Sequence, residues 1–373
     1  MKIGIVVRIL WSGGVQRIAF AEAKLLKERG HDVELIFIRK SKLWMGNYDE
    51  YQNVTILSQK GVENRFIGKF LDMLTLHYAP QRGVEGRVDA DLILKFEIHR
   101  SAYDVLIYFD QMTSLFSLIG KIRHDGKTII YVHETSLKDK GVFNKLVDFV
   151  GINLCDGIIT QSQFNKKLLS RFRSKKLLML YPGVDEVRVS HGFEERRNIA
   201  LSVTLWDSGR HPEYFVDIAR HFDFGRIILA GGWTDDSFRQ LMTQRIKQEG
   251  IEDKLLITGP ISEDVLNHLY QESKLFIRFG YNEAGPGMGS LEALSHGLPI
   301  IINSGIGIKE ILKNGFNCEV VDEKNSIDVA IVMSNLMEDK RAWEFMSNNN
   351  LKLSKELSWH RHGQILDEFI RNI

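Results

Sequence analysis

Cysteine and proline are scarce in this chain of 373 residues, which has two cysteines and six prolines. The two cysteines, Cys155 and Cys318, exclude a disulfide-stapled scaffold and a cysteine-rich zinc site, and they suit a reducing compartment. No run of apolar residues approaches the ~20 that a helix needs to span a bilayer. We do not expect a signal peptide, because the first apolar run is short and leads into a Gly pair rather than a small-residue cleavage site.

Hydrophobic residues make up 44% of the chain, which is enough for packed cores and excludes a disordered or fibrous protein. At roughly 150 residues per domain the length favours two domains, although one large α/β domain would also fit.

The net charge of +1 conceals an asymmetry between the two halves of the chain. Residues 1–185 carry 28 basic and 20 acidic side chains, a net of +8, whereas residues 186–373 carry 21 and 28, a net of −7. The basic half either favours an anionic partner, such as a phosphorylated acceptor or an anionic membrane, or reflects chance variation. Nucleic acid is not expected as a partner, because the basic residues are dispersed and no recognised binding module is visible.

Short β-branched runs alternate with amphipathic helical stretches along nearly the whole sequence. The first strand, at 3–9, is expected to be buried on both faces because its apolar residues hardly alternate with polar ones. This alternation predicts an α/β fold with two doubly wound parallel sheets. The expected strands are 3–9, 33–38, 105–109, 128–132, 157–160 and 177–180 in the first series, and 199–205, 226–230, 255–258, 275–278, 300–303 and 319–321 in the second.

The turn sequence YPGVD, at 181–185, separates the two series of strands. We therefore expect an N-terminal domain at 1–186 and a C-terminal domain at 187–355. The residues that follow, 356–373, form a terminal helix that is expected to pack back on the N-terminal domain.

The histidines and one aromatic segment of the first half are relevant to metal binding and to membrane contact, respectively. The 12 histidines show no metal-ligand spacing, and His360 and His362 in the terminal helix are expected to face solvent. The aromatic and basic stretch at 66–76 is interpreted as a core-facing amphipathic helix, with contact to a membrane or a lipid acceptor as the alternative.

The first glycine-rich turn, Gly13-Gly14, follows the first strand and opens the first helix. Glycines there permit a ligand to approach the backbone closely, although a plain tight turn would have the same sequence. The turn is not G-x-G-x-x-G, so a nicotinamide dinucleotide site is poorly supported.

A second glycine-rich segment, at 281–310, passes from a strand end through a loop into a helix. The unpaired N–H groups at the start of such a helix suit a diphosphate. Glu292, near the first turn, either accepts hydrogen bonds from ligand hydroxyls such as those of a ribose or simply favours the helix dipole. The residues expected to offer N–H groups are Gly287, Met288, Gly289 and Ser290.

Residues 285–299, GPGMGSLEALSHGLP, resemble the signature of retaining glycosyltransferases of family 4, which have the GT-B fold. Three other segments match in order: Gly13–Arg17 the family's first loop, Tyr131–Glu134 the strand end with the active-site His, and Tyr181–Asp185 the interdomain turn. The resemblance covers nearly the whole chain, and the combination is specific. It implies two Rossmann-like domains that face each other across a cleft, with the acceptor on the first and the nucleotide-sugar on the second.

The resemblance also implies roles for single residues. His133 would contact the transferred sugar or the acceptor, Arg210 would bind the donor diphosphate, and Glu283 would reach the donor sugar. Two positions depart from the family pattern. Leu205 stands where the family has an Arg, and Ala284 stands where it has the first of two Glu, with Glu283 one residue earlier.

The implied reaction moves a hexose from a nucleotide-diphosphate sugar to a hydroxyl of a glycan or lipid-linked saccharide, with retention and without a cofactor or metal ion. Gly13 and Gly14 are expected among the donor-binding residues. From the two cysteines and the charge asymmetry we expect a cytoplasmic location, with peripheral contact to the inner face of the membrane. Two other functions stay open: a non-catalytic sugar-nucleotide-binding subunit of a transferase complex, and a nucleotide-sugar epimerase of the same fold.

Overall fold

The computed structural model divides the chain into two compact units, and each is described by itself. Unit 1 consists of Met1–Pro182 and Trp359–Ile373, and unit 2 of Gly183–Ser358. The stretch at 66–76 lies outside the described residues, as does Ala284. The structure describes residues 1–11, 13–41, 53–59, 84–85, 87–88, 102–109, 125–133, 149–171, 175–187, 191–281, 283 and 285–373.

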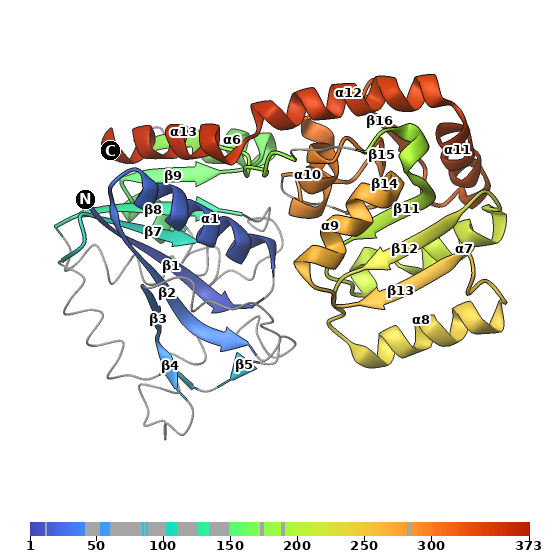
Figure 1. Cartoon of the computed structure of the whole chain (residues 1–373). Helices are drawn as coiled ribbons and strands as arrows, with labels where there is room; N and C mark the ends of the chain where they lie inside the picture. Colours follow the sequence, from blue (N-terminus) through green and yellow to red (C-terminus); the bar gives the residue numbers. More distant parts are fainter. Residues whose placement is uncertain are drawn as a thin grey trace. The chain divides into compact units, whose positions relative to one another are not determined.

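Unit 1 is built on a parallel sheet in the strand order β10-β9-β8-β7-β1-β2-β3 (Figure 1). The central strand β1 is buried along nearly its whole length, as its largely apolar sequence predicts. Two short pairings are antiparallel, β5 with β2 and β4 with β6. The elements of unit 1 are β1 (Lys2–Leu10), α1 (Gly14–Glu28), β2 (Asp32–Ser41), β3 (Val54–Ile56), β4 (Ser58–Gln59), β5 (Val84–Glu85), β6 (Arg87–Val88), β7 (Val105–Phe109), β8 (Lys127–Val132), β9 (Gly157–Thr160), α6 (Gln163–Leu169), β10 (Lys176–Met179) and α13 (Trp359–Arg371).

The last helix of the chain, α13, packs against α1 within unit 1. His31 Nε2 lies 2.7 Å from Asp367 Oδ1, and Arg29 Nη2 donates to the His360 carbonyl at 3.0 Å. The expectation that His362 faces solvent is wrong, because this side chain is buried at 3% exposure. His362 lies on the same helix face as Leu366 and therefore points toward α1.

His362 is buried because it joins three parts of unit 1. Its Nδ1 lies 2.8 Å from the Tyr181 carbonyl, and its Nε2 lies 2.9 Å from Glu22 Oε1 in α1. A carbonyl only accepts, so Nδ1 carries a proton, and a second proton is shared between Nε2 and the carboxyl. Burial raises the pKa of Glu22, and His362 opposes that shift. The contact therefore compensates a carboxyl group that would otherwise be costly to bury.

Unit 2 contains a six-stranded parallel sheet in the order β13-β12-β11-β14-β15-β16. Two apolar clusters form its core, one containing Phe215, Ile277 and Trp343, the other Leu201, Phe276 and Leu291. Neighbouring residues of β14 thus belong to different clusters, as expected for a strand covered on both faces. The elements are β11 (Arg197–Val203), α7 (Glu213–His221), β12 (Arg226–Ala230), α8 (Asp236–Gln248), β13 (Leu255–Gly259), α9 (Glu263–Glu272), β14 (Ser273–Arg278), α10 (Met288–Ser295), β15 (Ile300–Asn303), β16 (Cys318–Val321), α11 (Ser326–Glu338) and α12 (Lys340–Glu356).

The structure confirms two parallel, doubly wound sheets, and each strand expected from the sequence is present with ends shifted by a few residues. Sequence reasoning missed α11 and α12. Their start signals are clear in the structure, since Asn325 accepts from the Asp328 N–H and Asp339 accepts from the N–H groups of Arg341 and Ala342.

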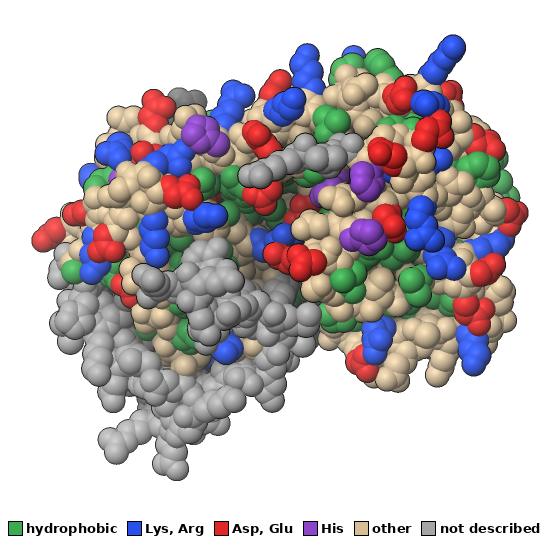
Figure 2. All heavy atoms as spheres, in the orientation of Figure 1, with side chains coloured by type: hydrophobic (Ala, Val, Ile, Leu, Met, Phe, Trp, Pro, Cys, Tyr) green, Lys and Arg blue, Asp and Glu red, His purple; other side chains and the backbone are tan. Residues whose placement is uncertain are grey.

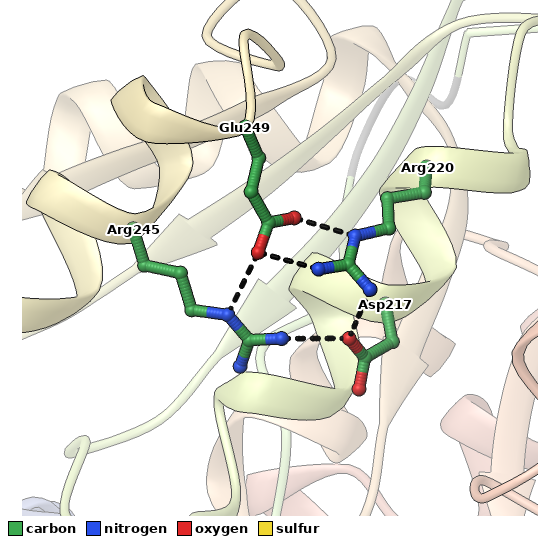
Figure 3. A network of polar contacts seen from close by, with 4 residues as sticks. All are labelled: Asp217, Arg220, Arg245 and Glu249. Atoms are coloured by element: carbon green, nitrogen blue, oxygen red, sulfur yellow. Dashed lines mark hydrogen bonds and ion pairs between the residues drawn. The ribbon is translucent and has the colours of Figure 1, made fainter.

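A network of four charged side chains ties α7 to the end of α8 on the surface of unit 2 (Figure 3). Both arginines, Arg220 and Arg245, donate to the Glu249 carboxylate, at 2.5 Å and 2.9 Å for their Nε atoms. Arg245 also donates to Asp217 at 2.8 Å. Hydrogen bonds from Arg220, followed by those from Arg245, lower the pKa of Glu249 despite partial burial.

Among the described residues, no helix combines the length and the apolar composition needed to cross a membrane.

Replacing His362 by Ala should lower the free energy of unfolding by about 3 kcal/mol, because it leaves the buried Glu22 carboxyl without its partner on α13. Urea denaturation of the full chain measures this. His360→Ala is the control, since His360 is exposed on the same helix and its loss should change stability by less than about 0.5 kcal/mol. Equal stabilities for the two variants would contradict the assignment.

Replacing Glu249 by Gln should cost less than about 1 kcal/mol at pH 7, because the network lies at the surface. The pKa of Glu249 is lowered in the folded state, so its contribution is present above pH 4.5 and is lost as the pH falls through the lowered pKa. The stability difference between the wild type and the variant should therefore shrink in acid. Thermal unfolding at a series of pH values tests this, and a difference that grows in acid would refute it.

Candidate active site

The loops that follow β11, β14 and β15 lie at one edge of the sheet of unit 2, because these three strands are adjacent and parallel. Ligands bind at this edge in open α/β sheets. The first loop contains a short 3₁₀ helix, η5 (Ser208–Arg210), and the second leads into α10. The residues that the sequence singled out in unit 2 all belong to these two loops or to the start of α10.

The carboxylate of Glu283 connects the two loops. Its Oε1 accepts from Arg278 Nη2 at 2.8 Å and also forms an ion pair with Arg210 Nη1. Arg278 is the last residue of β14, and Arg210 ends η5. One carboxylate thus faces two guanidinium groups at the carboxyl edge of the sheet.

The two arginines differ in how far they are buried. The Arg278 side chain is 7% exposed, whereas that of Arg210 is 31% exposed. Burial, followed by repulsion from Arg210, lowers the pKa of Arg278 to about 9. Burial also lowers the pKa of Arg210, and the charge of Asp207 opposes that shift. Both groups thus lie where a cation is poorly hydrated and attracts an anion strongly.

The backbone around Arg210 has an unusual conformation. His211, the next residue, has φ 49°, and it is the one described non-glycine residue with a positive φ. Its Nδ1 lies 2.7 Å from Glu213 Oε1, and its ring lies edge-on to Tyr281 at a centroid distance of 4.8 Å. These contacts hold His211 in a left-handed backbone conformation that residues other than glycine rarely adopt. They thereby fix the backbone position from which the Arg210 side chain projects.

Helix α10 begins beside Arg278. Gly287 caps the helix, and a Cβ atom at this position would lie 2.5 Å from Arg278 Nη1. The glycine is therefore required for the guanidinium to lie against the start of the helix. No acidic residue stands in the first turn, and the first N–H groups of a helix have no partner within it. The Ser290 N–H, which was expected to be offered to a ligand, instead donates to the Gly287 carbonyl at 3.0 Å. The amides of Met288 and Gly289 lie before it, next to the buried cation.

Three further residues at the start of α10, Met288, Gly289 and Ser290, are closely packed. A Cβ atom at Gly289 would lie 2.8 Å from the Val203 carbonyl, so a glycine lets α10 approach the end of β11. Ser290 is fully buried, and its Oγ has no hydrogen-bond partner among the described residues. Met288 is half-buried and packs against the cluster that contains Leu291.

Glu292 is held by Tyr270, which sequence reasoning did not single out. The Tyr270 hydroxyl lies 3.0 Å from Glu292 Oε2 and 2.9 Å from the Gly289 carbonyl. The Tyr270 ring stacks on His296 at a centroid distance of 5.1 Å. Tyr270 is thus a positioning residue for the glutamate, and the predicted contact of Glu292 with a ribose stays a prediction.

Glycines also bring the loops after β14 and β15 together. A Cβ atom at Gly307 would lie 2.0 Å from the Gly285 carbonyl oxygen, and one at Gly305 would lie 2.7 Å from the Gly280 carbonyl oxygen. The Gly280 N–H donates to Asn303 Oδ1 at 3.0 Å. The second loop is therefore braced by the third.

The remaining predicted site residues belong to unit 1. His133 follows β8 and is buried, with its ring stacked on Tyr131 at 4.2 Å. The Gln161 amide nitrogen lies 3.0 Å from His133 Nδ1. This hydrogen bond between the two side chains holds the orientation of the His133 ring.

Gly13 caps α1, and Gly14 is the first residue of that helix. A Cβ atom at Gly13 would lie 2.9 Å from Gln16 Oε1 and from Trp11 Nε1, so this position is closely packed. His133 and Gly14 follow strands of the same parallel sheet and lie at its carboxyl edge. Their predicted roles in donor or acceptor binding stay predictions.

Arg278 was missed by sequence reasoning, which treated it only as the end of a strand. The available signal was a charged residue that closes an otherwise apolar run, Leu275–Arg278. Leu205, at the position expected to hold an Arg, is half-buried.

Within the part of the chain that the structure describes, no three His, Cys, Asp or Glu side chains come together in a way that could hold a metal ion. Metal independence of the reaction stays a prediction.

Two protein-family models match the chain. The model described as Glycosyltransferase Family 4 matches residues 12–188, and the model described as Glycosyl transferases group 1 matches residues 184–353. The matched regions follow one another and leave only short segments at the two ends.

Two curated relatives match about half of the chain. An uncharacterized glycosyltransferase, MJ1607 of Methanocaldococcus jannaschii, is 24% identical over 227 residues, which cover 55% of this chain and 57% of the relative. The mannosylfructose-phosphate synthase of Agrobacterium fabrum is 23% identical over 226 residues, which cover 54% of this chain and 50% of the relative. The chain thus spans about half the length of the curated relatives it matches.

Solved structures match over the whole chain. Anabaena Alr3699/HepE in complex with UDP has a TM-score of 0.80 and 15% identity, and the match covers 100% of both chains. The sucrose-phosphate synthase from Thermosynechococcus elongatus has a TM-score of 0.79 and 12% identity, with 100% of this chain and 98% of that chain covered. At such identities the likeness concerns the fold. With both family models matched, the chain belongs to the family 4 type of glycosyltransferases and has their GT-B fold of two Rossmann-like units.

Proposed function

We propose that the chain transfers a hexose from a nucleoside-diphosphate sugar to a hydroxyl of a glycan or lipid-linked saccharide, with retention and without a metal ion. One observation carries this proposal. The Arg210 guanidinium and the start of α10 lie at the same edge of the sheet and are joined through Glu283 and Arg278. Cationic and N–H donors thus gather where a diphosphate would be bound.

The chemistry explains why such donors are needed. As the bond between the anomeric carbon and the diphosphate oxygen breaks, negative charge grows on the leaving group and the sugar becomes oxocarbenium-like. Preorganised donors that face this charge lower the barrier. Arg210 supplies a planar fork that suits two phosphate oxygens, and the amides of Met288 and Gly289 supply fixed dipoles. A metal ion is unnecessary where these donors suffice.

Retention follows from the direction of attack. The acceptor oxygen bonds to the anomeric carbon on the face that the diphosphate vacates, and the acceptor proton passes to a phosphate oxygen of the leaving group. Unit 1 would bind the acceptor at the edge that carries Gly14 and His133. The His133 imidazole suits a hydrogen bond with a sugar hydroxyl, which can both donate and accept.

The nucleotide can be identified by stability. Anabaena Alr3699/HepE, which shares the fold, was solved in complex with UDP and with UDP-glucose, so UDP and its sugars are the first ligands to screen. GDP, ADP and their sugars complete the screen, because binding to the folded state raises the apparent melting temperature by mass action.

Replacing Arg210 by Ala should lower donor turnover at least about tenfold, because one donor to the transition-state charge is lost. The release of nucleoside diphosphate from the best donor of the screen measures this. Arg197→Ala is the matched control, since Arg197 is 69% exposed at the start of β11 and pairs only with Glu272 among the described residues. The control should keep full turnover.

Unchanged turnover in the Arg210 variant would remove this residue from the site. Two other outcomes would replace the proposed function. Donor binding without hydrolysis or transfer to any acceptor would favour a non-catalytic subunit. Conversion of the donor to an isomeric sugar without an acceptor would favour an epimerase.

We also propose a cytoplasmic location with peripheral contact to an anionic membrane, motivated by the net +8 of residues 1–185. Unit 2 offers no such excess, because basic and acidic side chains are interspersed on its face in Figure 2.

Because of the net positive charge of residues 1–185, the chain should sediment more strongly with vesicles that contain anionic lipid than with neutral vesicles, and salt should weaken the difference. Equal sedimentation with both kinds of vesicle would refute the contact.

A further inference from the structure

The counterions of the two site arginines are unevenly shared, because Asp207 acts on Arg210 whereas Arg278 relies on Glu283. Arg278 and Arg210 both face this one carboxylate, and Arg278 has no other ion pair among the described residues. Asp207 acts on Arg210 but is not among the groups that influence Arg278. The buried guanidinium of Arg278 therefore shares its described counterion with a second cation.

Arg278 also has an unused hydrogen-bond donor. Its Nε is buried and has no acceptor among the described residues, although Nη2 is bonded to Glu283. The side chain is 7% exposed, so water cannot freely replace the missing acceptor. Burying a cation is costly unless it is paired and its N–H groups are satisfied. Arg278 therefore offers a buried N–H group, unsatisfied among the described residues, that an anionic ligand could accept from.

The surroundings of Arg278 favour a phosphate group as that anion. The guanidinium lies against Gly287, where any side chain would collide with it, and the amides that open α10 follow directly. A helix start and a cation that converge on one point form a site for phosphate oxygens. The hydroxyl of Ser290, in the same turn, is buried without a described partner.

We propose that Arg278 is a second cation for the donor diphosphate, and that Glu283 occupies the two arginines as an internal anion until the diphosphate displaces it. This inference rests on the proposed function and names a further binding residue of the same site. The proposal also explains how Leu205 can stand where the family pattern has an Arg. Arg278, at the end of β14, supplies the cation that the loop after β11 lacks. Binding is then an exchange of one anion for another between fixed guanidinium groups.

The exchange predicts opposite effects for two substitutions. Arg278→Met keeps the approximate volume of the side chain and removes its charge, so it should weaken UDP binding at least about tenfold and make that binding less sensitive to salt. Glu283→Gln removes the competing anion, so it should tighten the binding of UDP and of inorganic pyrophosphate several-fold. Uridine, which has no phosphate, should respond to neither change.

Isothermal titration calorimetry of the full chain measures these affinities, with thermal unfolding as a check on folding. Lys274→Met is the matched control, because it removes another buried cation of β14, one that donates to the Met337 carbonyl. It should leave the affinity for UDP unchanged. Should Arg278→Met fail to fold, Arg278→Gln replaces it as the test of Arg278, and the Glu283→Gln titrations still test the exchange.

The outcomes separate this inference from the proposed function. A wild-type chain that binds none of UDP, GDP, ADP or pyrophosphate would overturn both. A wild type that binds UDP while Arg278→Met binds it equally well would overturn only the role of Arg278. Affinity for pyrophosphate that stays the same or falls in Glu283→Gln would overturn the exchange.

Discussion

Parallel pairing of β14 with β11 and β15 is the constraint on which the candidate site depends. It brings the ends of three strands to one edge, so that residues far apart in the sequence, such as Arg210 and Arg278, face one carboxylate. Glycines then allow distances that side chains would forbid, at Gly287 beside the guanidinium and at Gly307 between the loops. The strand order determines the edge of the sheet at which the hydrogen-bond donors lie, and the glycines determine how closely the loops and the Arg278 guanidinium approach one another.

Charged side chains of unit 2 have different energetics at the surface and in the buried site. The network of Arg220, Arg245 and Glu249 lies near solvent, where ion pairs contribute little and depend on salt. Arg278 lies where the same charge is far more costly and its pKa falls to about 9. The free-energy cost of burying a charge favours binding of an anion, because the anion stabilises the buried guanidinium.

The sequence predicted those features that depend on local pattern. The strands of both sheets and the glycine-rich turn before α10 were found because each leaves a signal within a few residues. Arg210 was singled out through the family resemblance, and its role stays a prediction. The pairing of Arg278 with Glu283 could not be predicted, because it depends on the path of a loop and on the space at Gly287. His362 could have been found from its spacing of four to Leu366, but a histidine on an apolar face does not by itself reveal a buried glutamate as its partner.

The return of α13 to unit 1 has a consequence for how the chain is made. Glu22 emerges from the ribosome 340 residues before its partner His362. Unit 2, which lies between them in the sequence, is synthesised before unit 1 can be completed. Until α13 is synthesised Glu22 lacks the His362 imidazole, whereas all six strands of the C-terminal sheet are already available.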